Sequence, residues 1–220
     1  AKKGVEFDLC SFSDIKGDLH THTTWTGGKQ SVEEMARAAE ELGYQYIGIA
    51  DHTKYLQVEN GLDEEDLEKQ RKEINKVNKK IKGEGLKFKI LQGCEANILK
   101  DGSLDISDEA LEKLDFVIAG IHSHFKLDKE EMTKRLIRAI RHPQVNIISH
   151  PTGRLIKKRE SLNLNINKII KVSKEESVIL EINSSPHRLD LSDKYIKQCV
   201  DNDQYLIINS DAHHKDQLKN

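Results

Sequence analysis

Seven short apolar runs rich in β-branched residues recur along the chain, and an amphipathic stretch follows most of them. The runs cover residues 16–22, 46–52, 87–95, 115–122, 145–150, 178–183 and 205–211. Near-continuous apolar runs are typical of parallel strands that are buried on both faces. Strands that alternate with helices predict an α/β fold with right-handed crossovers. Seven such units favour a barrel over an open sheet.

The stretches between the runs carry helix signals. Helices are expected over residues 31–42, 63–82, 129–140, 166–174 and 192–200, with a short turn or helix near 107–113. Ser31 and Glu34 form a capping box at the start of the first helix, and Gly43 follows its end. No low-complexity linker interrupts the pattern, so residues 1–220 are assigned to one domain. The chain begins at Ala1 rather than Met and ends soon after the last strand, which indicates a fragment of a longer protein.

Composition narrows the classes of function. The formal net charge of -2 argues against nonspecific binding of polyanions through bulk charge. Cys10, Cys94 and Cys199 are widely spaced and odd in number, so we expect no disulfide framework and a reducing, cytoplasmic location. No apolar run is long enough to span a membrane, so no membrane partner is expected.

Residues that can bind metals stand at or just after the ends of most predicted strands. They are His20, His22, His52, Glu95, His122, His150, Asp211 and His213. The carboxyl ends of parallel strands converge on one face of a barrel, so these side chains are expected to meet there. His20 and His22 are two residues apart on a strand and therefore point the same way. Asp211 and His213 repeat that spacing.

Metal binding explains this concentration of imidazoles and carboxylates, because burying them together without a cation is costly. Divalent metals accept histidine nitrogen and carboxylate oxygen as ligands. Eight groups exceed the needs of one tetrahedral ion, so two or three ions are expected, with Glu95 as a bridging carboxylate. Clustered metals can hold the attacking and leaving oxygens of a phosphoryl group. No serine nucleophile elbow and no glycine-rich phosphate loop is found, so a metal-bound water or hydroxide is the expected attacking group.

The motifs GDLHTHTTW, IADHT, GCEANIL, IHSHF, SHPTGRL and INSDAHH, taken in order, resemble the polymerase and histidinol phosphatase (PHP) superfamily of metal-dependent phosphoesterases. The longer segments DGSLDISDEALEKLDFVIAGIHS and INSSPHRLDLSD are similar to the C-terminal PHP domain of bacterial and archaeal family X DNA polymerases. The resemblance runs from about Asp14 to the end of the chain. It implies a distorted (β/α)7 barrel with its active site at the C-terminal strand ends. It also implies zinc, manganese or iron as the metals.

The resemblance places the metal ligands on the same eight residues. Among these, His20, His22, Glu95 and Asp211 are expected to shape the site of the catalytic water. One position departs from the pattern, because Gly27 stands where the first loop of the family carries an aspartate. Glycine has no donor atom, so one metal is expected to be weakly held, hydrated, or ligated by another group.

Other residues near the predicted site suit substrate binding or support. Arg154 and Arg188 fall in segments shared with the family and are expected to contact phosphate. Asp18 and Asp51 precede metal ligands and are expected to orient them, as outer carboxylates do.

The leading hypothesis is hydrolysis of phosphoesters at DNA 3′ ends, as a 3′-5′ exonuclease within a family X polymerase with a role in DNA repair. Polymerase domains would then precede this segment in the parent chain, which would itself be a DNA-directed DNA polymerase. One alternative is a stand-alone phosphatase acting on histidinol phosphate or a similar small phosphomonoester. Another is a metal-stabilised structural module of a DNA polymerase that has no activity of its own.

Overall fold

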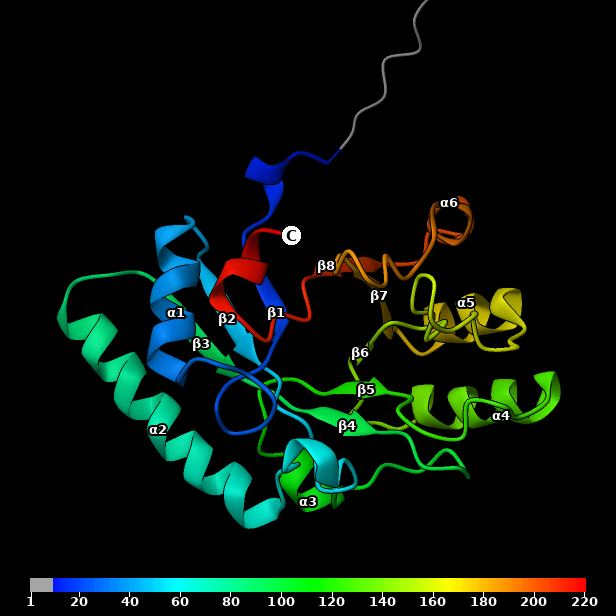
Figure 1. Ribbon diagram of the computed structural model, residues 1–220, viewed down its shortest axis with the longest axis horizontal. Helices are drawn as coiled ribbons and strands as arrows, with labels where there is room; N and C mark the ends of the chain where they lie inside the picture. The colour runs from blue at the N-terminus through cyan, green and yellow to red at the C-terminus, as the bar shows by residue number, and fades with distance from the viewer. Residues whose placement is uncertain (1–9) are drawn as a thin grey trace, which may run out of the picture.

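The computed structural model describes residues 10–220 and contains two sheets whose paired strands all run parallel (Figure 1). The first sheet has the order β1-β2-β3, formed by Gly17–Thr21, Tyr46–Ile49 and Lys89–Gln92. The second has the order β4-β5-β6-β7-β8, formed by Glu95–Asn97, Ile118–Gly120, Ile147–Ile148, Ile179–Asn183 and Leu206–Asn209. The predicted α/β class with parallel strands is confirmed. Residues 1–4, where the predicted fragment begins, lie outside the described residues.

The prediction of one strand over 87–95 is wrong, because the structure divides this segment between the two sheets. β3 pairs with β2, whereas β4 pairs with β5. The break falls at Gly93 and Cys94. A Cβ at Gly93 would lie 2.4 Å from the ring of Phe116, so only glycine lets this ring pack against the break. The break leaves Glu95 at the start of β4.

The two sheets meet at two seams. An isolated parallel bridge joins His52, after β2, to Glu95. A second bridge joins Thr21 of β1 to Ala212, after β8. The amide of His22 donates to the carbonyl of Ala212 at 2.8 Å, which strengthens the second seam. In Figure 1 the C-terminal segment accordingly lies beside β1. The second seam therefore brings the first and last strands of the α/β pattern together.

The main helices lie outside the sheets and confirm the predicted positions to within a few residues. They are α1 (Val32–Glu41), α2 (Glu64–Gly83), α3 (Asp108–Leu111), α4 (Lys129–Ile140), α5 (Ile166–Glu175) and α6 (Asp193–Asp201). Short 3-10 helices cover Phe12–Asp14, Gln57–Glu59 and Lys215–Lys219, and the last of them follows β8. The expected capping box of α1 is present, with Glu34 accepting from the Ser31 amide at 2.8 Å.

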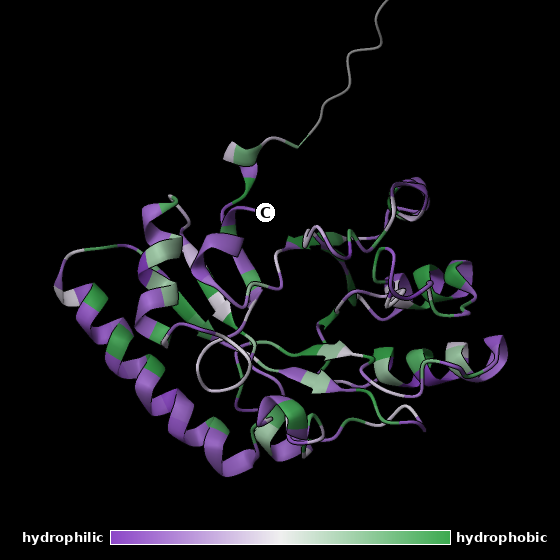
Figure 2. Ribbon diagram, viewed as in Figure 1, coloured by the Kyte–Doolittle hydropathy of each residue, from purple (hydrophilic) through white to green (hydrophobic). Residues whose placement is uncertain are grey.

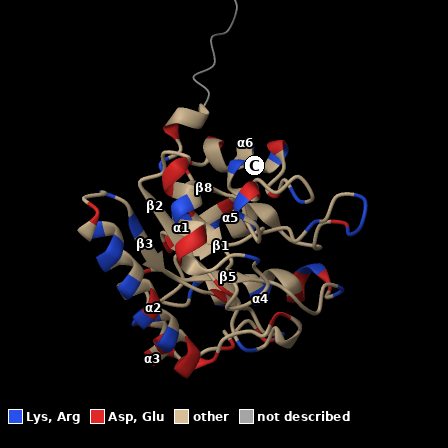
Figure 3. Cartoon of the chain, turned by 60° about the vertical axis from the view of Figure 1, so that its left-hand side comes forward, with Lys and Arg blue, Asp and Glu red and all other residues tan. Residues whose placement is uncertain are grey.

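Apolar side chains fill the space between helices and strands. The face of α2 that carries Ile74 and Ile81 packs with Ile47 and Ile90 of the first sheet. Figure 2 shows the resulting division of α2 into apolar and polar faces. Basic and acidic residues are interspersed along α1 and α2 (Figure 3), as expected for solvated helix faces.

A separate apolar cluster draws side chains from both sheets. Its buried members are Ala50, Phe116, Ile118 and Ile147, and Leu19, Leu91, Ile179 and Ile207 pack against it. The strands β1, β3, β5, β6, β7 and β8 all contribute to this cluster. The inner faces of the two sheets therefore share one core.

No helix within residues 10–220 is both long enough and apolar enough to cross a membrane.

Thiol reactivity tests the packing of the core. Cys94 and Cys199 are buried, and burial raises the pKa of the Cys199 thiol to about 11, whereas Cys10 is exposed. We expect one thiol per native chain to react rapidly with an aromatic disulfide reagent, and all three after denaturation. Rapid reaction of three thiols in the native chain would contradict the described core.

Candidate metal centre

The predicted ligands come together at the carboxyl ends of the strands, around Glu95. Five imidazole nitrogens lie within 3.7 Å of its carboxylate oxygens. The nitrogens and distances are His20 Nε2 3.3 Å, His22 Nε2 3.7 Å, His52 Nδ1 3.0 Å, His122 Nε2 3.2 Å and His150 Nε2 2.9 Å. Glu95 is 1% exposed, so its charge is removed from water. The first residue of β4 therefore joins side chains from both sheets.

Asp211 and His213 complete the cluster from the segment after β8. Asp211 Oδ1 lies 3.3 Å from His22 Nε2 and 3.6 Å from His20 Nε2. The rings of His22 and His213 stack with centroids 4.1 Å apart. The ends of β1 and β8 are brought together by the second seam, which explains why residues from both ends of the chain meet here.

The donor set fits divalent metal ions. Several buried donor atoms lack a hydrogen-bond partner among the described residues: His20 Nε2, both ring nitrogens of His22, His52 Nδ1, His122 Nε2 and Glu95 Oε2. Buried polar atoms without partners are rare and costly in folded proteins. Three groups have ligand atoms within 4.8 Å of one another: His22 with His52 and His213, His20 with His22 and Glu95, and His52 with Glu95 and His122. Cations bound in these groups would satisfy the unpaired atoms.

Electrostatics in the cluster favour a bound cation. Burial alone would raise the pKa of Glu95, but the surrounding histidines hold that pKa well below its usual value. Burial lowers the pKa of His22 well below its usual range and that of His150 to about 4. Neighbouring carboxylates outweigh burial at two other rings: Glu181 and Glu95 raise the pKa of His20 well above its usual value, and Glu95 raises that of His52. Metals bind neutral imidazoles and ionised carboxylates, so a bound cation would take the place of the protons that the carboxylates favour on His20 and His52.

Two residues that the sequence analysis missed hold ligand rings in place. Glu181 of β7 lies with its Oε1 2.7 Å from His20 Nδ1, and Asn97 of β4 has its Oδ1 2.8 Å from His122 Nδ1. Both are buried. Contacts of this kind orient metal-ligating histidines and select the nitrogen that is left for the metal. The available signal was the single acidic residue within the apolar run 178–183.

Asp18 and Asp51 lie beside the cluster but hold its main chain and loops rather than its rings. Asp18 accepts from the amides of His20 at 2.8 Å and Ser210 at 3.0 Å, so it ties β1 to the end of β8. Asp51 accepts from the amide and hydroxyl of Thr23, the hydroxyl of Thr26 and the side-chain amide of Gln70. These contacts fix the loop that follows His22.

The two predicted phosphate-binding arginines occupy different positions. Arg188 reaches the cluster, with its Nε 3.2 Å from Asp211 Oδ2. Its Nη1 is buried and has no hydrogen-bond partner in the described part of the chain. Arg154 instead donates from its Nε to the carbonyl of Arg188 at 2.8 Å and from Nη2 to that of Leu189. The structure therefore brings Arg188 to the cluster and places Arg154 against the loop that carries it.

Gly27 lies beside the cluster, in the loop between β1 and α1. A Cβ at this position would be 3.3 Å from Cδ2 of His213. The following glycine is required by packing, because a Cβ at Gly28 would be 2.4 Å from the carbonyl oxygen of His22. The loop is tied to the C-terminal segment by the amide of Lys29, which donates to the carbonyl of His213 at 2.9 Å. A side chain at position 27 would therefore point at the rim of the cluster.

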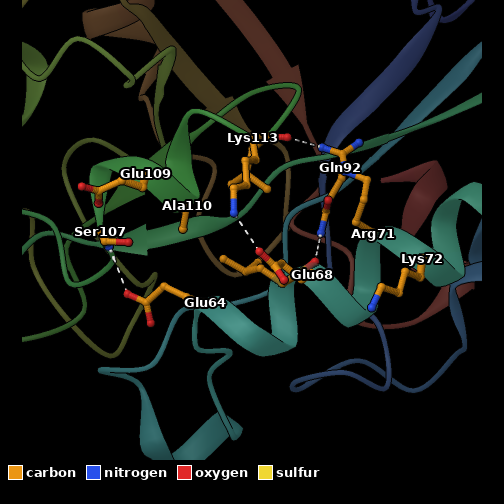
Figure 4. Close-up of a pocket in the computed structure, with 11 residues that line it drawn as sticks. Glu64, Glu68, Arg71, Lys72, Gln92, Ser107, Glu109, Ala110 and Lys113 are labelled. Carbon is orange, nitrogen blue, oxygen red and sulfur yellow. Dashed lines mark hydrogen bonds and ion pairs between the residues drawn. The ribbon is translucent and has the colours of Figure 1, made fainter.

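A separate pocket of about 430 Å³ lies between α2 and α3 (Figure 4). Lys113 and Glu68 form an ion pair of 2.7 Å there. None of the predicted site residues lines this pocket. Its lining combines apolar side chains with this one exposed ion pair and holds no buried ligand cluster.

The fold and the buried cluster define an α/β protein with a candidate multi-metal centre at the carboxyl ends of its strands. The chain belongs to the PHP domain family, whose model matches residues 18–185. Membership of this family, together with relatives named as phosphatases, supports a phosphoesterase hydrolase.

Two relatives and one solved structure illustrate this similarity. The chain is 42% identical over 211 residues to "DNA polymerase/3′-5′ exonuclease PolX" of Bacillus subtilis, which covers 96% of this chain and 36% of the relative. It is 34% identical over 173 residues to a probable phosphatase of Caldanaerobacter subterraneus, covering 76% of this chain and 62% of the relative. The chain thus spans about a third of the first relative and under two thirds of the second.

A histidinol phosphatase-like protein of Listeria monocytogenes, hisK, has the same fold. It superposes with a TM-score of 0.70 at 16% identity, covering 92% of this chain and 97% of that one. At this identity the likeness concerns the fold alone.

Proposed function

We propose that this chain is a metal-dependent phosphoesterase whose centre is the cluster around Glu95. The observation that carries the proposal is a cluster of imidazole and carboxylate donors in which several buried atoms, from His20, His22, His52, His122 and Glu95, lack hydrogen-bond partners in residues 10–220. The ligands are the eight residues His20, His22, His52, Glu95, His122, His150, Asp211 and His213. They would hold two or three divalent ions of zinc, manganese or iron.

Bound ions would supply Lewis-acid charge to a phosphoryl group and lower the pKa of a water molecule. The chain's own residues position the reaction. Glu95 keeps the imidazoles of both sheets together, and Asp211 holds Arg188 at the edge of the cluster. The unpartnered Nη1 of Arg188 suits a phosphate oxygen, since guanidinium groups bind phosphate through parallel N–H donors. Arg154 positions the loop of Arg188 through two backbone carbonyls.

We further propose that the two sheets act as one distorted (β/α)7 barrel formed by a single domain. Counting β3 and β4 as one bent strand gives seven strands, which are linked at the two seams by isolated bridges. The apolar cluster shared by six strands of both sheets supports this reading, because barrel interiors are filled by inward side chains.

The substrate we propose is the 3′ end of DNA, hydrolysed in the 3′-5′ direction. Similarity to PolX along 96% of the chain supports it, and the uncovered part of that relative leaves room for polymerase domains in the parent chain. Phosphatase-named relatives support a second candidate, a small phosphomonoester such as histidinol phosphate.

The test compares both substrates on the chelator-treated chain after addition of Mn²⁺. We expect stepwise removal of nucleotides from the 3′ end of a 5′-labelled single strand, and no removal while chelator is present. Faster turnover of histidinol phosphate than of DNA would favour the phosphomonoesterase. Metal binding without hydrolysis of either substrate would contradict the proposal and favour a structural module.

Replacing Glu181 with glutamine tests the support of the centre. Glutamine retains an oxygen and the approximate volume of glutamate but removes the charge beside His20 Nδ1. We expect affinity for Mn²⁺ to fall about 10- to 100-fold, the usual cost of losing an outer partner of a ligating histidine. Calorimetric titration measures the change. Unchanged affinity in a variant that keeps the native circular dichroism spectrum would show that Glu181 does not support metal binding.

A further inference from the structure

We propose that Glu59 supplies the carboxylate that position 27 lacks, and that it completes a metal site with His22, His52 and His213. The inference rests on the proposed metal centre and concerns the identity of one of its ligands. Glu59 belongs to the short 3-10 helix Gln57–Glu59, in the segment that joins β2 to α2. No motif in the sequence marks it as a ligand.

The carboxylate of Glu59 occupies the space of a side chain at position 27. A Cβ built at Gly27 would lie 2.3 Å from Glu59 Oε2 and 3.1 Å from its Cδ. The same point is 3.3 Å from the ring of His213. A carboxylate reaching this place from residue 59 therefore lies where a short acidic side chain at residue 27 would extend. The absence of a side chain at Gly27 is what admits it.

The segment carrying Glu59 is anchored to the end of β2, next to the cluster. Thr53 and Leu62 form a parallel bridge, and the amide of Leu62 donates to the carbonyl of His52 at 2.8 Å. Gly61 allows this close return, because a Cβ there would be 2.0 Å from the carbonyl oxygen of Thr53. The amide of Glu59 donates to the carbonyl of Leu56 at 3.0 Å. The loop that carries Glu59 is thus anchored at His52 and Thr53, at the end of β2.

Charge also favours a carboxylate here. The groups that include Glu95 already contain an acidic ligand, whereas the group of His22, His52 and His213 is made of imidazoles alone. Glu59 has no ion-pair partner within residues 10–220. Glu59 is not among the residues whose ligand atoms already lie within 4.8 Å of one another, so it would join this group on metal binding. It would bring the group to four protein ligands, the number that structural zinc sites usually have, and add a negative charge to balance the cation.

Four variants test the assignment: E59A, E59Q, the double variant G27D/E59A, and E41Q as a control at an exposed site on α1. Binding of Mn²⁺ to the chelator-treated chain is followed by the electron paramagnetic resonance of free Mn²⁺. We expect E59A and E59Q to weaken one Mn²⁺ site by at least about 10- to 100-fold, by analogy with the loss of other groups around metal sites. The double variant should regain that site, because the G27D substitution places a carboxylate in the vacated space. E41Q should bind as the parent does.

Retention of the parent's stoichiometry and affinity in both Glu59 variants would overturn the inference while leaving the metal centre intact. Loss of a site in E59A without recovery in G27D/E59A would contradict the equivalence of the two positions. Failure of the parent chain to bind Mn²⁺ would overturn the proposed function and this inference together. Circular dichroism of each metal-free variant shows that a loss of binding is not a loss of fold.

Discussion

Replacing Glu95 with glutamine is expected to remove most of the metal binding and hydrolysis. The substitution keeps the size of the side chain but leaves five imidazoles around a neutral amide. Loss of an outer partner of a ligand costs about 10- to 100-fold, so loss of the central ligand should cost at least about 100-fold in activity at a fixed Mn²⁺ concentration. Metal content by elemental analysis and the rate of nucleotide release measure the two effects.

The matched control is Glu65→Gln, because Glu65 is an exposed residue of α2 whose side chain pairs only with Lys69 in the described structure. It should retain parental activity and metal content. An E95Q variant that keeps both the parental rate and the parental metal content would place the reaction elsewhere on the chain.

Replacing Arg188 with alanine is expected to impair substrate binding while leaving the metals in place. Its Nη1 is buried without a partner beside the cluster, so this donor is available to a phosphate oxygen. A hydrogen bond to a charged group contributes about 1.5–3 kcal/mol, so kcat/KM should fall about 10- to 100-fold. Steady-state kinetics on the preferred substrate, combined with elemental analysis, separate this loss from loss of metal.

Arg141→Ala is the control for this prediction, because Arg141 is 59% exposed and pairs with Glu176 away from the cluster. Its kinetics should match the parent. Arg188→Lys should recover part of the activity, since lysine restores the charge but not the paired donors of guanidinium. An R188A variant that loses metal together with activity would assign Arg188 to the structure of the centre instead.

Much of the fold could be predicted because the apolar periodicity, the helix-capping residues and the residues at the strand ends all indicate the same α/β pattern. The apolar runs and amphipathic stretches specify strands and helices by their periodicity. The capping box at Ser31 and Glu34 marks the start of α1 to the residue. The histidines and carboxylates at the strand ends also lie together as expected, because parallel strands carry their carboxyl ends to one side.

The remaining features depend on contacts between residues that are far apart in sequence. At the division between β3 and β4 the ring of Phe116 packs against Gly93, and no local pattern encodes that contact. Glu181 looks like one acidic residue in an apolar strand until His20 is placed beside it. Arg154 and Arg188 look alike as basic residues, yet only the folded chain shows which one has a free donor at the cluster.

Anomalous diffraction from crystals soaked in Mn²⁺ tests the central claim most directly. The account predicts two or three anomalous peaks among the imidazoles and carboxylates around Glu95, with one of them between His22, His52, His213 and Glu59. Peaks confined to other parts of the surface, or no peak at the cluster in crystals that are saturated with Mn²⁺, would contradict it.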